Sequence, residues 1–305
     1  MFKRPSATGI GIIFAILGVV LFSTKAVMVK LAYVYEVDHV TLLLFRMGFA
    51  LPFYLLIAFW KKPLHPKEIR LKDYLWIVFF GFVGYYLASL FDFMGLHYIK
   101  AGLERIILFI YPTIVILLSW LFFKKKVTTV QAMAILVTYF GVVITFWDEI
   151  QIQGEAALWG GFLIFLSAIT YASYIVGSGW LIPKFGVLQF TSYAMIVSTS
   201  CILVHYALVG DFDFLGYPWQ VYALGLAMAL FATLIPSFLV SAAIERLGAS
   251  TFSIFGSLGP ISTIVLAFFF LDERITTLQI FGMLIVILGV SLVSRKRGRA
   301  NEVKS

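Results

Sequence analysis

Six ionisable residues interrupt long apolar stretches in the first half of this 305-residue chain. If these stretches cross a bilayer, each charge costs about 2.5–3.5 kcal/mol at the bilayer centre, so each needs a partner, water or a function. The chemistry open to such a group is ion pairing, solute binding or proton transfer. Four cations and two acids leave a surplus of two positive charges, which favours a solute with a carboxylate or another anionic group. The six residues are Lys25, Lys30, Arg46, Asp92, Glu104 and Arg105.

These residues differ in their expected depth. At a rise of 1.5 Å per residue, Lys25 lies about 12 Å, Arg46 about 10 Å and Asp92 about 7–8 Å from the outer end of its helix. The other three lie only a turn or so below the surface, where pairing or snorkelling is the simpler interpretation. We expect Lys25 or Arg46 to pair with Asp92, and Arg105 to pair with Glu104 or Asp92. For Lys25 and Asp92, structural pairing and a role in a solute cavity both stay open.

Helical spacing adds uncharged polar neighbours to this group. Tyr85, Ser89 and Asp92 share one helix face at i, i+4 and i+7. A later stripe of Ser and Tyr, running from Ser167 to Ser178, serves either hydrogen bonds between helices or a cavity wall. We predict a cavity with a charged wall from the first half of the chain and a hydroxyl and aromatic wall from the second. The predicted solute-binding residues are Lys25, Tyr85, Ser89, Asp92, Tyr111, Ser167, Tyr171 and Tyr174, and the predicted charge network around them is Lys30, Arg46, Glu104 and Arg105.

The elements that must position these side chains are membrane helices. Hydrophobic residues make up 62% of the chain and charged residues 12%, against roughly 45–50% and about 25% in soluble proteins. A span needs about 20 mostly apolar residues, and apolar runs of that length without strict alternation are helices, not barrel strands. The sequence therefore predicts an all-α integral membrane protein with ten transmembrane helices. They cover 9–33, 39–60, 73–97, 100–123, 128–147, 157–182, 187–209, 217–243, 248–271 and 275–294.

The positions of the basic residues predict the orientation. With both termini in the cytoplasm, four of the 23 Lys and Arg residues lie inside spans and two, Lys100 and Arg274, lie in outer loops. The remaining 17 lie on the inner side, which is the bias that membrane insertion produces. We therefore expect a multi-pass protein of the cell membrane, meaning the inner or plasma membrane, with the bilayer as its environment. The basic residues form short loops and tails, so the net charge of +8 gives no reason to expect a nucleic-acid partner.

The second half of the chain repeats the first. Residues 111–143 align with 259–291 at a constant offset of 148, which pairs Pro112 with Pro260 and Gly141 with Gly289. Each copy contains five spans, and since five is odd, the two copies enter the membrane from opposite sides. This pattern predicts two inverted five-helix repeats, a design that supports alternating access to a site near the midplane. The predicted units are 1–147 and 157–294, followed by a basic cytoplasmic tail at 295–305.

Two features of the repeats suggest mechanical roles. Pro112 and Pro260 occupy equivalent mid-helix positions in the fourth and ninth spans, and each is either a hinge or a static kink. The fifth and tenth spans are apolar and carry small residues, so they form either a scaffold or the contact face of a homodimer.

Several of these residues resemble a known family. The stretch FSTKAVMVKLA at 22–32, Arg46, and the pattern GP…LDERITTLQ…G…GV across the last two spans are similar to EamA-type members of the drug/metabolite transporter superfamily. The resemblance covers 9–294 and implies a ten-helix secondary carrier, often an exporter of amino acids or other small metabolites. Lys30 and Glu273 match common positions of that pattern. Lys25 and Lys125 depart from it.

Other kinds of chemistry find no support in the sequence. No GxxxxGK[ST] motif is present to bind ATP. The four histidines lack metal-ligand spacing, and the single cysteine has no catalytic partner, so we expect no enzyme activity, metal or cofactor. Energy must come from a gradient or from exchange, and Asp92 and Glu104 are the membrane carboxylates that could carry a proton. We predict an exporter of small organic metabolites that works by alternating access. A channel-like or receptor-type multi-pass protein without alternating access is the alternative.

Overall fold

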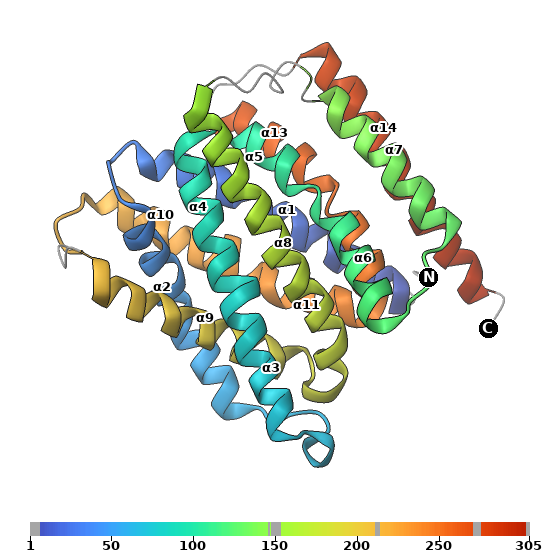
Figure 1. The fold of residues 1–305 in the computed structure, drawn as a ribbon, viewed down its shortest axis with the longest axis horizontal. Helices are drawn as coiled ribbons and strands as arrows, with labels where there is room; N and C mark the ends of the chain where they lie inside the picture. Colours follow the sequence, from blue (N-terminus) through green and yellow to red (C-terminus); the bar gives the residue numbers. More distant parts are fainter. Residues whose placement is uncertain (1–6, 146, 148–153, 211–213, 271–275, 303–305) are drawn as a thin grey trace, which may run out of the picture.

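The computed structural model describes residues 7–145, 147, 154–210, 214–270 and 276–302. This part of the chain is helical and contains no β-strand. Figure 1 shows the helices gathered into one bundle, with α7 and α14 side by side along one edge. The helices are α1 Ala7–Tyr33, α2 His39–Trp60, α3 Leu71–Gly81, α4 Ala88–Tyr98, α5 Ala101–Leu108, α6 Tyr111–Phe123, α7 Thr129–Thr145, α8 Gly154–Phe185, α9 Val187–Val209, α10 Trp219–Ala229, α11 Ile235–Leu247, α12 Ala249–Phe255, α13 Leu258–Phe270 and α14 Thr277–Glu302, with a 3-10 turn η1 at Pro66–Glu68 and π-helical segments η2 at Phe82–Leu87 and η4 at Leu230–Leu234.

Eight helical stretches of the described chain are long and apolar enough to cross a membrane. Two shorter apolar helices, Thr129–Thr145 and Thr277–Leu292, correspond to the predicted fifth and tenth spans. Large apolar side chains of the eight longer stretches face outward, as lipid requires, and include Phe59 of α2 and Leu208 of α9 at 84% and 78% exposure. The prediction of an all-α multi-pass membrane protein is therefore confirmed. Beyond its apolar part, α14 continues to Glu302 and so enters the segment expected to form the basic cytoplasmic tail at 295–305, and that tail stays a prediction.

Four of the spans are interrupted, and the interruptions correspond between the two halves. The third span contains η2 and the eighth contains η4, and their first residues are 148 positions apart. The fourth and ninth spans break between α5 and α6 and between α12 and α13, next to Phe109 and Gly256. The segments η2 and η4 are π-helical, and π-helical turns within α-helices occur often at functional sites.

The two paired prolines do not lie in the middle of continuous helices, which corrects our expectation. Pro112 is the second residue of α6, and Pro260 is the third residue of α13. The first four N–H groups of a helix have no partner within it, so a proline there removes no helical hydrogen bond. The helix breaks just before each proline, and the break does not result from a backbone hydrogen bond that the proline itself fails to make.

Helices of the first half pack mainly against helices of the second. α1 packs on α11 and α13, α8 packs on α4 and α6, and α2 packs on α9. α7 and α14 pack closely along their length, where a Cβ added to Gly141 would lie 2.8 Å from Val286 and one added to Gly289 would lie 2.6 Å from Thr138. The glycines of the fifth and tenth spans thus allow α7 and α14 of the same chain to pack closely against each other. A homodimer through these spans stays a prediction, and it would use their outer faces.

One end of the bundle, which we call the basic end, carries Lys61, Lys62, Lys67, Lys72 and Lys184. The loop after α2 is tied there to the end of α8, since the backbone N–H of Leu64 donates to the carbonyl of Phe185 at 3.1 Å and that of His65 donates to the carbonyl of Lys184 at 2.9 Å. The Nζ atom of Lys184 lies 2.9 Å from Oδ1 of Asp73, the residue that caps α3. We call these three contacts the basic-end latch. The outer-loop positions Glu273 and Arg274 lie outside the described residues.

Candidate solute cavity

A cavity of about 60 Å³ lies between helices of both halves. Seven of the eight predicted solute-binding residues line it, and the eighth, Tyr174, packs directly behind them. The Tyr174 ring centroid lies 5.0 Å from that of Tyr85 and 6.3 Å from that of Tyr171. The seven lining residues are Lys25, Tyr85, Ser89, Asp92, Tyr111, Ser167 and Tyr171.

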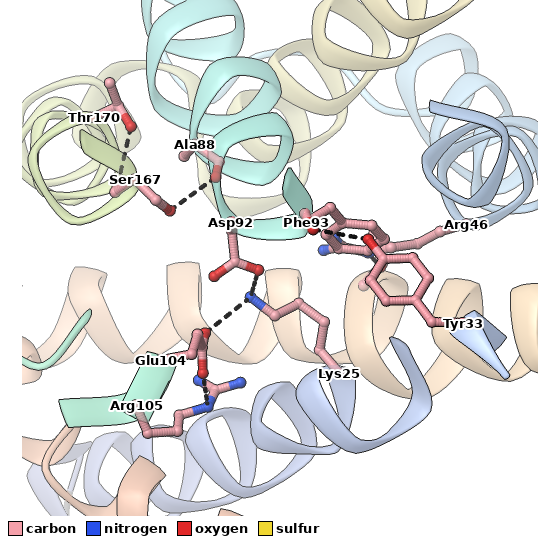
Figure 2. Close-up of polar contacts among 11 residues, drawn as sticks. Lys25, Tyr33, Arg46, Ala88, Asp92, Phe93, Glu104, Arg105, Ser167 and Thr170 are labelled. Carbon is pink, nitrogen blue, oxygen red and sulfur yellow. Dashed lines mark hydrogen bonds and ion pairs between the residues drawn. The ribbon is translucent and has the colours of Figure 1, made fainter. Parts of the chain in front are cut away.

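The charged wall is a chain of four buried groups, shown in Figure 2. The Nζ atom of Lys25, on α1, lies 2.5 Å from Oδ2 of Asp92 on α4 and 3.8 Å from Oε1 of Glu104 on α5. The Nε atom of Arg105 lies 2.9 Å from Oε2 of Glu104. All four residues are at most 5% exposed. We call this group the charge cluster; with two cations and two acids it is electrically neutral when all four are ionised.

Two of the expected ion pairs, Lys25 with Asp92 and Arg105 with Glu104, are thus present. Glu104 and Arg105 are both buried within the protein, because α5 is covered by α4, α8 and α13. Their shallow position in the bilayer stays a prediction. Lys30 is partly buried and donates to the carbonyl of Leu96 at 2.6 Å, which satisfies it away from the cavity.

Arg46 does not pair with Asp92, although that pairing was one expectation. Its Nε atom donates instead to Oγ1 of Thr233 at 2.7 Å, and its Cζ atom lies 5.4 Å from the ring centroid of Phe93. Arg46 belongs to α2 and Thr233 to η4, so this hydrogen bond joins the two halves of the chain. The side chain is completely buried.

The uncharged wall comes from α8, and it serves both of the roles left open for it. The Ser167 hydroxyl donates to the carbonyl of Ala88 at 2.8 Å, which joins α8 to α4, and Ser167 also lines the cavity. The Tyr171 ring lies 6.0 Å from that of Phe22 and 5.4 Å from that of Tyr111. Ser178 donates to the carbonyl of Tyr174, four residues earlier, so it contributes only to its own helix.

Sequence reasoning missed several functional contacts that the glycines permit. A Cβ on Gly84 would lie 2.3 Å from Cβ of Tyr174, and one on Gly256 would lie 1.5 Å from the hydroxyl oxygen of Tyr111. Both glycines line the cavity, and their lack of a side chain lets the tyrosines approach. A glycine inside an apolar span indicates such a close approach, but the sequence does not say to which residue.

A row of hydroxyls on the eighth span was also missed. Thr233, Ser237 and Ser241 follow each other at i, i+4 and i+8 and are at most 3% exposed. Thr233 accepts from Arg46, Ser237 shares a 2.8 Å hydrogen bond with the Tyr54 hydroxyl, and Ser241 accepts from Thr191 at 2.7 Å. The spacing rule that found the Ser and Tyr stripe on the sixth span would have found this row as well.

The family emerges from comparison with known proteins. Residues 9–147 and 158–295 each match the EamA-like transporter family. The chain belongs to the EamA-like transporter family. It is similar to "Uncharacterized transporter YcbK" of Bacillus subtilis, with 29% identity over 95% of each chain. It is also similar to "Uncharacterized transporter sll1319" of Synechocystis, with 26% identity over 84% of this chain and 79% of the relative.

A solved crystal structure shares the fold. Its TM-score to this chain is 0.71 with 13% sequence identity, over 95% of this chain and 96% of its own. The family match and the long apolar helices show that the protein is a multi-pass membrane transporter.

Proposed function

We propose that this transporter is a secondary carrier that exports small organic metabolites, such as amino acids, across the cell membrane by alternating access. In this proposal the chain forms ten transmembrane helices as two inverted five-helix repeats, with both termini in the cytoplasm. The solute binds between the repeats, in the cavity that holds the charge cluster.

The size and place of the cavity carry this proposal. Sites for small organic molecules typically measure about 300–1,000 Å³, whereas this cavity is about 60 Å³. Its walls come from α1, η2, α4, α5 and α6 of the first half and from α8, α11, α12 and α13 of the second. A site of the usual size would therefore form here only if helices of the two halves move apart, which is the motion that alternating access requires.

The correspondences between the halves support an inverted repeat. The π-helical segments η2 and η4 occur at the same place in the third and eighth spans, and the breaks at Phe109 and Gly256 occur at the same place in the fourth and ninth. The packing partners also correspond, because α1 packs on the eighth span as α8 packs on the third. Inverted repeats of this kind place the substrate site at the interface between the repeats.

Two modes of energy coupling remain to be separated by experiment. Asp92 and Glu104 are each engaged by a cation, so a proton that neutralised either one would break an ion pair and loosen the cluster. Proton antiport would use that step, whereas solute exchange would leave the cluster intact. A pH gradient imposed across proteoliposomes should drive uphill transport only if the first mode operates.

Counterflow tests the carrier directly. In proteoliposomes preloaded with a metabolite mixture, external labelled metabolites should enter faster than into empty vesicles, and the rate should saturate. Asp92→Asn should abolish the stimulation, and the matched control Glu245→Gln, at an exposed carboxylate near the basic end, should retain it. Flux that neither saturates nor responds to internal solute would show the channel-like alternative and refute the carrier.

A further inference from the structure

Arg46 carries a buried charge that the described structure leaves uncompensated. Its side chain is 0% exposed, and its one hydrogen bond, from Nε, goes to the neutral hydroxyl of Thr233. The Nη1 and Nη2 atoms have no hydrogen-bond partner among the described residues. No Asp or Glu oxygen of that part of the chain lies within ion-pair distance of it, whereas Lys25 and Arg105 both have acidic partners.

A guanidinium group cannot escape this situation by losing its proton, because it stays charged in proteins. An unpaired buried charge is strongly unfavourable unless a counter-charge or water reaches it. The charge cluster is neutral by itself, so the surplus of two positive charges lies on Lys30, which is only partly buried and donates to the carbonyl of Leu96, and on Arg46, which is completely buried. The anionic character that the sequence suggested for the solute therefore concerns Arg46 and not Lys25.

The surroundings of Arg46 present its two free nitrogens near the cavity. Figure 2 shows the side chain extending from α2 to Phe93, next to the charge cluster. Tyr33 fixes this part of α4 by donating to the carbonyl of Phe93 at 2.7 Å. Arg46 also interacts electrostatically with Tyr85 and Asp92, which both line the cavity. The Nε atom is held by Thr233, and the remaining Nη1 and Nη2 atoms form what we call the Arg46 fork. Arg46 itself is not one of the residues that line the cavity.

We propose that the Arg46 fork is the site that binds the carboxylate of the solute when the cavity widens. This rests on the proposed carrier function. Two parallel N–H donors match the two oxygens of a carboxylate, and such bidentate pairs are the strong form of charge-assisted hydrogen bond. Binding supplies the missing counter-charge, so it stabilises the widened state in proportion to the affinity of the anion. Asp92, whose Oδ1 atom has no hydrogen-bond partner, stays with Lys25 and can meet a cationic group on the same solute.

Formate is the probe, because it is the smallest carboxylate and needs the least widening. The purified full-length protein in detergent is heated in increasing formate or chloride at constant ionic strength. We expect formate to raise the Tm by about 2 °C at roughly five times its dissociation constant, with a further rise that follows the logarithm of its concentration, and chloride to have a smaller effect. Arg46→Gln should abolish the formate shift, and the control Lys62→Gln, at an exposed lysine of the basic end, should retain it. Because Arg46→Gln could fail to fold, Arg46→Lys provides a second variant that keeps the charge but lacks the fork, and the formate concentration that gives the same shift should rise at least tenfold.

Several results would overturn the site. A formate shift that persists unchanged in Arg46→Gln would do so, as would equal shifts from formate and chloride. If formate acts on Asp92→Asn but not on the unaltered protein, then Asp92 itself is the counter-ion of Arg46 in another state, and the solute site is refuted. The proposed function can fail separately: absent counterflow refutes the carrier whatever formate does, whereas normal counterflow with no formate effect refutes only the Arg46 site.

Discussion

Lys25 and Asp92 meet across 67 positions of sequence, and their contact is the most direct link between the composition of the chain and its cavity. Both are fully enclosed, so the energy of the pair depends on their mutual neutralisation and not on water. Removing one partner of a buried pair is far more harmful than removing both, because the remaining charge stays buried. We therefore expect Lys25 to stabilise the fold, in addition to its proposed role in binding the solute.

Lys25→Met should lower the free energy of unfolding by about 3–5 kcal/mol, because Asp92 then lacks its closest partner. The double variant Lys25→Met with Asp92→Asn should recover most of that loss, since the remaining Glu104 and Arg105 pair is neutral. Chemical denaturation in detergent measures both effects, and neither variant should show counterflow. A double variant no more stable than Lys25→Met alone would contradict the pairing, and a Lys25 variant that transports normally would make Lys25 only a structural partner.

The sequence made the charge cluster predictable because few charges lie inside the spans, and each must find one of the others. It did not make the partner of Arg46 predictable. The spans contain many hydroxyl groups, and Thr233 carries no charge that would mark it as the partner of Arg46. The contacts at Gly84 and Gly256 could not be predicted for a related reason. A glycine indicates that another group can approach closely, but it does not indicate which residue does so.

At the scale of elements, the irregular turns determine where helices can approach each other. Gly84 lies in η2, and Tyr174 of α8 fits against it. Hydropathy located the spans because burial in lipid needs length and apolarity. It did not reveal the π-helical turns, since η2 has no proline and only Pro236, just after η4, marks the second one.

Gly84→Ala should lower the free energy of unfolding by about 1–3 kcal/mol, because the added methyl group would force α8 away from the third span. Gly48→Ala is the matched control, since an added Cβ there meets nothing within 4 Å. In a helix interior that change should stabilise by about 0.5–1 kcal/mol. Both are measured by thermal unfolding in detergent, and equal effects of the two variants would show that the close approach at Gly84 is unimportant.

The basic-end latch holds the two halves together at one end of the cavity. Lys184→Ala should change the free energy of unfolding by about 1 kcal/mol or less, because the Lys184 side chain is 30% exposed. It should nevertheless increase opening at that end, since Asp73 loses its partner across the halves. The measurement is the rate at which a cysteine at position 89, in a Cys201→Ser background, reacts with a thiol reagent added from the basic side. We expect a several-fold increase with Lys184→Ala and none with Lys62→Ala, and equal rates would exclude a gating role.

At the scale of the whole molecule, the distribution of basic residues predicts which side faces the cytoplasm. Cysteines replacing Lys125 and Lys100, each placed alone in the Cys201→Ser background, should label differently in intact cells. An impermeant thiol reagent should reach position 100 from outside and position 125 only after the membrane is opened. The reverse result would invert the topology and place the basic end outside. The repeat was visible in the sequence because equivalent glycines and prolines keep their spacing, whereas the small volume of the cavity follows only from the packing of side chains.

The central claim is that one cavity opens to each side of the membrane in turn, and the accessibility of position 89 from both sides tests it most directly. In oriented vesicles that carry Ser89→Cys and Cys201→Ser, an impermeant reagent should react from either side. The basic end is then closed by a short thiol crosslinker between His65→Cys and Lys184→Cys, whose backbones share a hydrogen bond there. In the test protein the cysteine at position 89 is reversibly protected while the crosslinker is applied. A matched protein that keeps serine at position 89 receives the same crosslinker as a control. After closure, reaction from the basic side should stop and reaction from the other side should continue. Labelling that continues from both sides after crosslinking, or that only ever occurs from one side, would contradict alternating access.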